Sequence, residues 1–454
     1  MGEANPSIGG LNMSTDIRIV LVSLLLMVMG VEARAQKKWT LEQCIDYAYE
    51  HNLEIVNSRI NNGIKKVDLR IAKNEKLPDL NGYTNMYTKF GQGQDVFGTT
   101  RRNDNLNAEA GINANIYLYN QGKLSNEIHK ADLLVNVSEE ELAVIKRNIA
   151  IKVIEYYLAI QLNKEIARAV DSSAYYAGIQ YDKAEKTTKA GTTALSVQYE
   201  AKANWAKELQ KAKKANQDID RAKINIVQLI QYPDYKTFDI AELESAEHGL
   251  KGMAYPLEDA VTMASNNHPE VKRLNLQRKV FEIDNKIIKA DLYPTVRGGA
   301  MIGSLYFNSL VTSGDPKFFG QIRDNFAQQI AVTVSIPIFN KGRVKNNLAK
   351  NNFVIQQNEI ANKQQLNTIR QEIEKLYFDY RAYLDQYDAS LEMLSSAKMA
   401  LGFTINSYEA GKSSIYDLNI SRANTLNAES ETLQAKYNCL FVSKMIKFYI
   451  EEKL

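Results

Sequence analysis

The feature that most restricts the fold of this chain is a change of hydrophobic period that occurs twice. Residues 106–118 alternate between apolar and polar side chains, as a strand does, and a helical pattern follows Gly122. The same change recurs through residues 326–338 and Gly342, 220 positions later. The repeat predicts a duplicated unit in which a strand leads directly into a long helix.

Glycine and proline are absent from three long segments, residues 123–177, 343–401 and 412–454. Runs of this length without either residue are typical of long helices. The first segment carries one apolar stripe at helical spacing, formed by Ile145, Ile149, Val153, Tyr156 and Ile160. If this helix continues to the turn at Gly191, it extends roughly 100 Å, far more than a compact domain requires.

The two halves of the chain repeat one order of motifs. Residues 41–52 return in pattern at residues 257–268, and Pro78 returns as Pro294, both with an offset of 216. Each half therefore reads helix, strand, loop, strand, long helix, turn, helix. The two repeats comprise residues 36–254 and 255–454.

The first strands of the repeats are expected at about 80–90 and 295–307, and the second strands at about 106–118 and 326–338. In the second strands one face is apolar and the other carries polar side chains. Apolar-out and polar-in alternation of this length fits a strand that crosses a membrane at a tilt, although soluble β-sandwiches also alternate.

Four strands per chain are too few to close a membrane barrel. They leave two unpaired edges, and such edges cannot face lipid. Several copies must therefore pool their strands, giving eight, twelve or sixteen around a shared axis. All four junctions between strands and helices lie at the same end of the two hairpins, so we expect a barrel that continues on one side as a helical tube.

Residues 1–35 have the pattern of a secretory signal, in which Arg18 precedes the apolar run of residues 19–29. This run is too short to cross a bilayer, and translation starts at either Met1 or Met13. The mature chain is therefore expected outside the cytoplasm. The full chain has 56 basic and 53 acidic residues, a balance that provides no basic face for nucleic acid.

Cys44 and Cys439 are the only cysteines, and we expect two buried free thiols, although spacing alone leaves a disulfide open. Four histidines show no metal-ligand spacing; they are His51, His129, His248 and His268. No zinc-protease, nucleophile-elbow or calcium-loop motif occurs. We therefore expect no catalytic residue, no bound metal and no cofactor.

The order of these motifs resembles the TolC family of outer-membrane efflux proteins. The resemblance rests on the duplicated halves, the opening at residues 41–52 with its echo at 257–268, the prolines at helix-to-strand transitions, and the small-residue turns after Gly191 and Gly411. It covers nearly the whole mature chain, residues 36–454. No single motif is specific, but their order and two constant offsets are.

The resemblance implies a mainly helical homotrimer with a transmembrane β part. Each chain would give four strands to a twelve-stranded barrel in outer-membrane lipid, continued by a periplasmic helical barrel, with a belt near residues 232–255. The partners would be a periplasmic adaptor and an inner-membrane transporter of the resistance-nodulation-division or ABC class. Barrel-to-helix junctions are expected at Pro78, Gly122, Pro294, Pro337 and Gly342. A stand-alone diffusion porin and a periplasmic coiled-coil scaffold stay open as alternatives.

The two helix-to-helix turns are the expected periplasmic tip and adaptor-docking surface. They comprise Gly191, Thr192 and Thr193 in the first repeat and Gly411, Lys412 and Ser413 in the second. Glycine also fits a purely structural interpretation, because helices commonly end in a left-handed residue.

Two residues match positions that close the entrance in the family, namely Tyr408 and Asp417. The second acidic position is Ile420 here, the arginine after the turn is Ser413, and the acidic partner of the tyrosine is Val197. The resemblance therefore implies a pore whose usual polar latch cannot form, while three copies of Asp417 favour cations. Asp417 equally fits a solvated carboxylate at a helix start.

Overall fold

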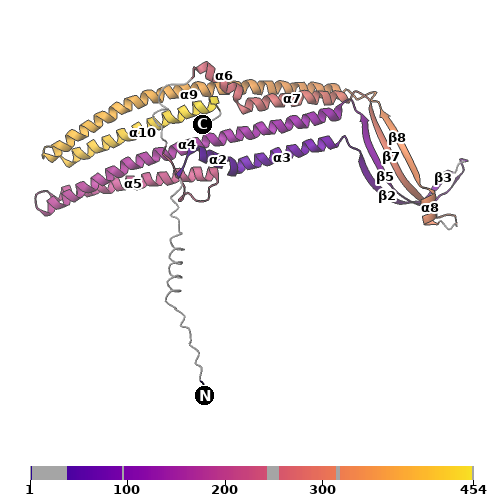
Figure 1. The fold of residues 1–454 in the computed structure, drawn as a ribbon, viewed down its shortest axis with the longest axis horizontal. Helices are drawn as coiled ribbons and strands as arrows, with labels where there is room; N and C mark the ends of the chain where they lie inside the picture. Colours follow the sequence, from indigo (N-terminus) through magenta and orange to yellow (C-terminus); the bar gives the residue numbers. More distant parts are fainter. Residues whose placement is uncertain (1, 3–37, 95–96, 243–254, 313–316, 452–454) are drawn as a thin grey trace.

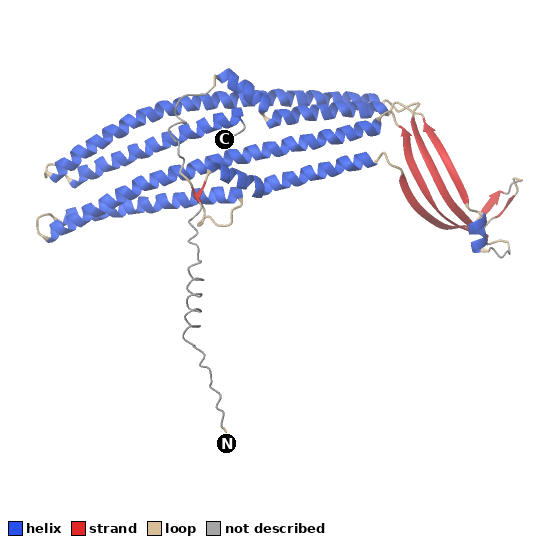
Figure 2. Ribbon diagram, in the orientation of Figure 1, coloured by secondary structure: helices blue, strands red, loops and turns tan. Residues whose placement is uncertain are grey.

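The computed structural model describes residues 2, 38–94, 97–242, 255–312 and 317–451. Within these ranges the protein is elongated, with a sheet at one end and a layer of long helices running away from it (Figures 1 and 2). The cleavage site and apolar run of the expected signal, residues 1–35, lie outside the described residues.

One antiparallel sheet contains four strands in the order β2-β5-β7-β8. The strands are β2 Asp79–Lys89, β5 Asn105–Tyr119, β7 Thr295–Ser309 and β8 Ala327–Ser335. The sequence placed the first three to within two residues of these bounds. The predicted end of the fourth at residue 338 is wrong: β8 stops three residues earlier, because Pro337 has no N–H to continue the ladder.

The register of the sheet places the apolar sides of all four strands on one face. Ile112 lies opposite Ile302, and Ala300 lies between Ala114 and Ile330. Residues directly opposite each other share a face, so these side chains form one apolar surface. The other face carries polar residues that include Asn81, Asn85, Glu109, Asn113, Gln329 and Thr333. The predicted alternation therefore holds across the whole sheet.

The loops between the strands contain structure that the sequence did not predict. In the first loop β3 Gln92–Gln94 pairs with β4 Thr100–Arg102, and in the second loop a short helix forms, α8 Phe318–Asp324. Both lie at the end of the sheet that is farthest from the long helices (Figure 1).

Long helices form the rest of the described chain. Their bounds are α2 Leu41–His51, α3 Leu53–Asn74, α4 Lys123–Lys189, α5 Leu195–Ile230, α6 Leu257–Asn267, α7 Pro269–Ala290, α9 Arg343–Glu409 and α10 Ile415–Glu451. α4 and α9 each contain 67 residues. A helix of that length extends roughly 100 Å, as expected from the sequence.

The helices are ordered as the strands are. Next to the sheet, α3, α4, α7 and α9 pack in that sequence, and α3 leads into β2 while β8 leads into α9. Toward the other end α5 packs on α4 and α10 on α9, with α10 also against α4. The main core lies where these layers overlap and includes Ile154, Ile226 and Phe448.

The first helix of each repeat is divided in two. Asn52 ends α2 and caps α3, with its side-chain oxygen accepting hydrogen bonds from the N–H groups of Glu54 and Ile55 at 2.9 and 3.3 Å. His268 takes the same place between α6 and α7, where its Nδ1 accepts from the Glu270 N–H at 3.2 Å. Pro269 at the first position of α7 reinforces this break.

Both cysteines are free and buried, in different core clusters. Burial, with a smaller effect from Glu42, raises the pKa of the Cys44 thiol to about 12. Burial and the charge of Asp388 raise the pKa of the Cys439 thiol to about 11. Neither thiol is therefore reactive near neutral pH.

Candidate functional site

The two helix-to-helix turns are built in the same way. Gly191 and Gly411 adopt left-handed conformations, with φ of 73° and 69°. The next residue in each turn donates its backbone N–H five positions back, from Thr192 to Thr187 at 3.0 Å and from Lys412 to Ser407 at 2.9 Å. This is the Schellman arrangement, which uses the last carbonyl groups of the helix.

Hydroxyl groups close both turns from inside. The Thr193 hydroxyl lies 2.9 Å from the Thr187 hydroxyl and 3.0 Å from the Thr188 hydroxyl. In the second turn the Ser407 and Ser413 hydroxyls are 2.6 Å apart. Thr193 and Ser413 are half-buried, whereas the other four predicted docking residues are exposed; these are Gly191, Thr192, Gly411 and Lys412. The surface open to a partner is therefore the exposed four.

Tyr408 lies against the opposite hairpin. The ammonium of Lys183 on α4 is 5.5 Å from the centre of the Tyr408 ring on α9. On α10, the Arg422 guanidinium is 5.4 Å from the centre of the Tyr176 ring on α4. Burial lowers the pKa of Arg422, while the nearby Tyr176 and Tyr408 act in the opposite direction. Two cation-aromatic contacts thus join the hairpins near their tips.

A groove of about 320 Å³ adjoins these contacts and is lined by residues that include Tyr176, Ile405, Arg422 and Glu429. Sequence reasoning identified Tyr408 but missed Lys183, Tyr176 and Arg422. Their spacing in the sequence carries no signal, because the partners lie on different hairpins and meet only after the hairpins pack.

Asp417 is an exposed residue in the first turn of α10. Its carboxylate accepts hydrogen bonds from the Ser414 N–H at 3.0 Å and the Ser414 hydroxyl at 2.7 Å, and Ser414 accepts one from the Asp417 N–H at 3.2 Å. The hydroxyl bond, then the backbone bond, lowers the pKa of Asp417. The side chain thus caps its helix and remains ionised in solvent, as the helix-start interpretation expects, while its place at the pore entrance stays a prediction.

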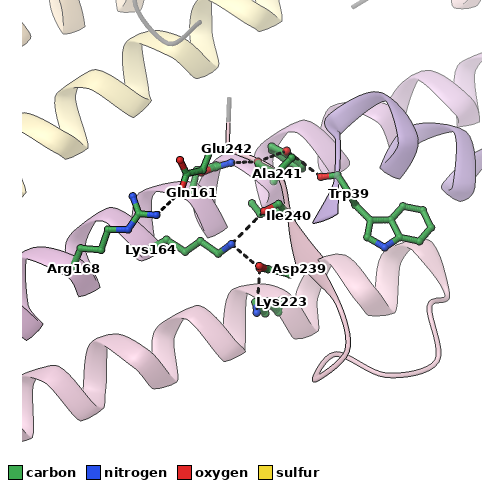
Figure 3. A network of polar contacts seen from close by, with 10 residues as sticks. Trp39, Gln161, Lys164, Arg168, Lys223, Asp239, Ile240, Ala241 and Glu242 are labelled. Carbon is green, nitrogen blue, oxygen red and sulfur yellow. Dashed lines mark hydrogen bonds and ion pairs between the residues drawn. The ribbon is translucent and has the colours of Figure 1, made fainter. Parts of the chain in front are cut away.

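A polar network lies near the middle of the helical layer, beside the short strands β1 Lys38–Trp39 and β6 Asp239–Ile240, which pair in parallel (Figure 3). Lys164 of α4 lies 2.6 Å from the Asp239 carboxylate, and Lys223 of α5 lies 3.4 Å from it. Burial alone would raise the pKa of Asp239, but Lys164 and Lys223 outweigh it and lower the pKa.

This strand pair forms the described part of the expected belt. The Tyr157 hydroxyl donates to the carbonyl oxygen of Ala241 at 2.7 Å and lies 3.2 Å from that of Trp39. Arg168 pairs with Glu242 at the edge of the same network (Figure 3). These contacts fasten the strand pair to α4 and α5. Residues 243–254, also assigned to the belt, lie outside the described residues.

A protein-family profile described as "Outer membrane efflux protein" matches residues 36–230 and 260–441. The chain belongs to this family. The match begins where the predicted signal ends and spans both repeats. No curated protein sequence gives a significant match.

Solved structures of outer-membrane channels share the fold. CusC matches with a TM-score of 0.72 at 15% identity, over 90% of this chain and 91% of CusC. The outer membrane protein VceC from Vibrio cholerae matches with 0.71 at 15% identity, over 91% and 95%. The CmeC outer membrane channel of Campylobacter jejuni matches with 0.70 at 14% identity, over 90% and 85%.

This outer membrane efflux protein therefore resides in the outer membrane, with its four strands as the barrel part and its long helices as the periplasmic part. No helix in the described ranges combines the length and apolar character needed to cross a membrane. Across the same described residues, no group of three or more His, Cys, Asp and Glu side chains gathers as a metal site.

The five predicted junction residues of the efflux protein all lie between sheet and helix. Pro78 and Pro294 directly precede β2 and β7, and Pro337 follows β8. Gly122 and Gly342 precede α4 and α9 with φ of 69° and 72°. A left-handed residue at each point lets the chain turn sharply from strand to helix. Lys123 fastens one junction by a 2.7 Å ion pair with Asp291, which follows α7.

Proposed function

We propose that this outer membrane efflux protein is the passive exit duct of a three-component export machine. It would act with a periplasmic adaptor and an inner-membrane transporter of the resistance-nodulation-division or ABC class. The duct would carry what the transporter delivers and catalyse no reaction. The observation that carries the proposal is that one chain forms only an open arc of wall, in both its sheet and its helices.

Both edges of the arc carry groups that another copy of the chain would cover. β2 and β8 end the sheet and each pairs on one side only. The helices beside them carry exposed apolar side chains, with Ile60 at 59% and Ile64 at 52% exposed on α3, and Phe353 at 66% on α9. A neighbouring copy would cover the strand edge and the apolar stripe together, which removes both sources of aggregation.

Three copies would give a closed wall. Four strands from each chain supply twelve, and the helical layers close alongside because α3 and α9 flank the sheet edges. The sheet's apolar face would then meet lipid and its polar face would line the pore. A homotrimer is therefore the assembly that we propose.

The length of α4 and α9 argues against a stand-alone porin, since a porin needs short periplasmic turns and these helices have 67 residues each. A periplasmic scaffold without a barrel does not fit a chain that carries this sheet and belongs to an outer-membrane family. The exit duct uses both parts of the molecule.

Oligomeric state and conductance test the proposal. We expect a heat-sensitive trimer in detergent extracts of outer membranes, which forms small and mostly closed channels in planar bilayers. Ile64→Asp should disrupt the trimer, whereas Lys65→Asp, beside it on α3, is the matched control and should not. A stable wild-type monomer, or a channel that stays open without any adaptor, would contradict the proposal.

Adaptor docking can be tested at the tips. Both native thiols are buried, so a cysteine placed at exposed Lys412 is the reactive one. Lys412→Cys should crosslink to the proposed periplasmic adaptor when the two proteins are co-expressed. Lys350→Cys, exposed on α9 near the sheet, should not. Equal crosslinking at both positions would remove the tip as the docking surface.

A further inference from the structure

Helix α8 replaces a missing piece of strand. β8 begins at Ala327 opposite Gly303, so the last part of β7, residues 304–309, has no strand on that side. There the Gln321 amide bonds to both the N–H and the C=O of Phe307, each at 2.9 Å. Next to it, the Asn325 amide donates to the Leu305 carbonyl oxygen at 2.6 Å. Side-chain amides thus form hydrogen bonds with backbone groups at a sheet edge, which lipid could not do.

The helix lies on the apolar face of the sheet. Ser304 donates from its hydroxyl to the carbonyl oxygen of Ile322 at 2.6 Å, and the Tyr306 and Phe318 rings are 4.9 Å apart. Ser304 and Tyr306 share a face with Ile302, because side chains two positions apart in a strand point the same way. α8 therefore covers the surface that turns away from the pore.

A groove of about 540 Å³ runs between α8 and this face. Its floor includes Gly82 and Ala110, and Ile112 and Ile302 line it farther along. On the α8 side it is bounded by Ile322 and Phe326. Gly82 has no side chain and Ala110 has a short one, which leaves space beside the larger Ile112 and Ile302.

Aromatic and basic side chains are exposed on α8 and beside it, and one of them, Phe326, also lines the groove. Phe318 is 46%, Phe319 85% and Phe326 55% exposed. Lys317 and Arg323 are also exposed, at the two ends of α8, and the Arg323 guanidinium pairs with the Asp324 carboxylate at 2.8 Å. Aromatic rings beside basic groups are typical of the membrane-water interface, where the rings contact acyl chains and the cations contact headgroup phosphates.

We propose that this groove binds an acyl chain of a membrane lipid, with the aromatic residues of α8 at the membrane surface. The groove is continuous with the lipid-facing side of the sheet, so a lipid reaches it without entering the pore. It is built from β2, β5, β7 and the α8 segment, so one chain supplies the whole groove. The inference rests on the proposed orientation of the barrel and adds a bound lipid to it.

Filling the groove tests the proposal. Ala110→Trp would occupy the floor, whereas Ala114→Trp lies four residues along the same strand and face but outside the groove. Each trimer is reconstituted in phosphatidylethanolamine and phosphatidylglycerol vesicles, re-extracted in mild detergent and examined by native mass spectrometry. We expect wild type and Ala114→Trp to retain phospholipid, and Ala110→Trp to lose most of it. Equal retention in both tryptophan variants, or none in wild type, overturns the proposal.

A second variant tests the proposal if Ala110→Trp does not assemble into trimers. Phe326→Ser removes one wall of the groove outside any strand, and it should lower lipid retention several-fold. Phe90→Ser, at a 73% exposed phenylalanine just beyond the end of β2, also lies outside any strand but is not part of the groove, and it serves as the control. Heat-sensitive trimers and wild-type conductance in these variants show that the exit duct is intact, so loss of lipid is separable from loss of the channel.

Discussion

Lys183 on α4 and Tyr408 on α9 are in contact, with the ammonium 5.5 Å from the ring centre. The two residues belong to different hairpins of one chain: Lys183 lies six residues before the end of α4 at Lys189, and Tyr408 is the next-to-last residue of α9. The contact therefore holds together two elements that must separate if the tip widens. Tyr408 thus has a cationic partner in Lys183, whereas Val197 stands where the family resemblance implies an acidic one.

Removing the Tyr408 ring should loosen the tip. A partly exposed cation-aromatic contact stabilises by about 0.5–1 kcal/mol, so Tyr408→Ala should raise the open-to-closed ratio about two- to fivefold per chain. Single-channel recording in planar bilayers measures this ratio. Tyr408→Phe keeps the ring and should behave as wild type, because the contact uses the ring face and not the hydroxyl. A leaky Tyr408→Phe channel would show that the hydroxyl holds the gate.

Asp417 combines helix capping with charge, and two substitutions separate these roles. Asp417→Gln removes the charge but keeps a side chain that can bond to the Ser414 N–H, since glutamine serves at this position of a capping box. It should weaken cation selectivity and leave thermal stability near wild type. Asp417→Ala should lower both. Unchanged selectivity in an Asp417→Gln trimer of normal conductance would show that the carboxylate lies outside the conducting path.

The pH dependence of selectivity follows from the same carboxylate. The hydrogen bonds from Ser414 lower the pKa of Asp417, so the group stays charged at any mildly acidic pH. Its contribution to stability, present above the unfolded pKa, is lost only as pH falls through the lower folded value. Reversal potentials should therefore show constant cation preference down to about pH 5. A loss of preference well above that pH would assign it to another group.

Local features of the sequence were sufficient for the long elements. The helix that begins with the run of residues 123–177 was expected to continue to the turn at Gly191, and α4 ends two residues before that glycine. Strand bounds follow from a two-residue alternation that the sheet keeps because one face is apolar. The match of Pro78 with Pro294 located two junctions, since proline fixes the chain where a helix gives way to a strand.

Contacts between distant segments could not be predicted in this way. Tyr408 was identifiable, but Lys183 was not, because packing of two hairpins selects the partner. The α8 helix was also missed: seven residues with no clear period carry no helical signal, and the unpaired edge of β7 that favours it is visible only once β8 is known to begin at Ala327.

The tip glycines should resist substitution for a conformational reason. Gly191 and Gly411 have positive φ, and no atom lies within 4 Å of an added Cβ at either position. Alanine is therefore disfavoured by its backbone alone, by about 1–2 kcal/mol. Gly402→Ala is the control: it also meets no atom within 4 Å, but it lies inside α9. Alanine there should stabilise by about 0.5–1 kcal/mol. Thermal unfolding that gives the same sign at all three positions would contradict this account.

His268 should make the protein sensitive to acid. Burial, then the nearby charge of Arg147, lowers its pKa from 6.5 to about 4, against an opposing effect of Glu270. The folded chain therefore keeps this imidazole neutral while the unfolded chain protonates it. Stability should fall as pH decreases from 6.5 toward 4, by up to about 3 kcal/mol per chain.

Asparagine at this position should remove the acid sensitivity without removing the cap. The equivalent residue of the first repeat is Asn52, which caps α3 through its side-chain oxygen and does not titrate. His268→Asn should therefore keep the unfolding temperature of wild type near about pH 7 and exceed it near about pH 5. His51→Asn, an exposed change one residue before Asn52, should keep the wild-type dependence on pH. If His268→Asn loses stability in acid as steeply as wild type, protonation of His268 is not the cause of the loss, and the acid-sensitive group lies elsewhere.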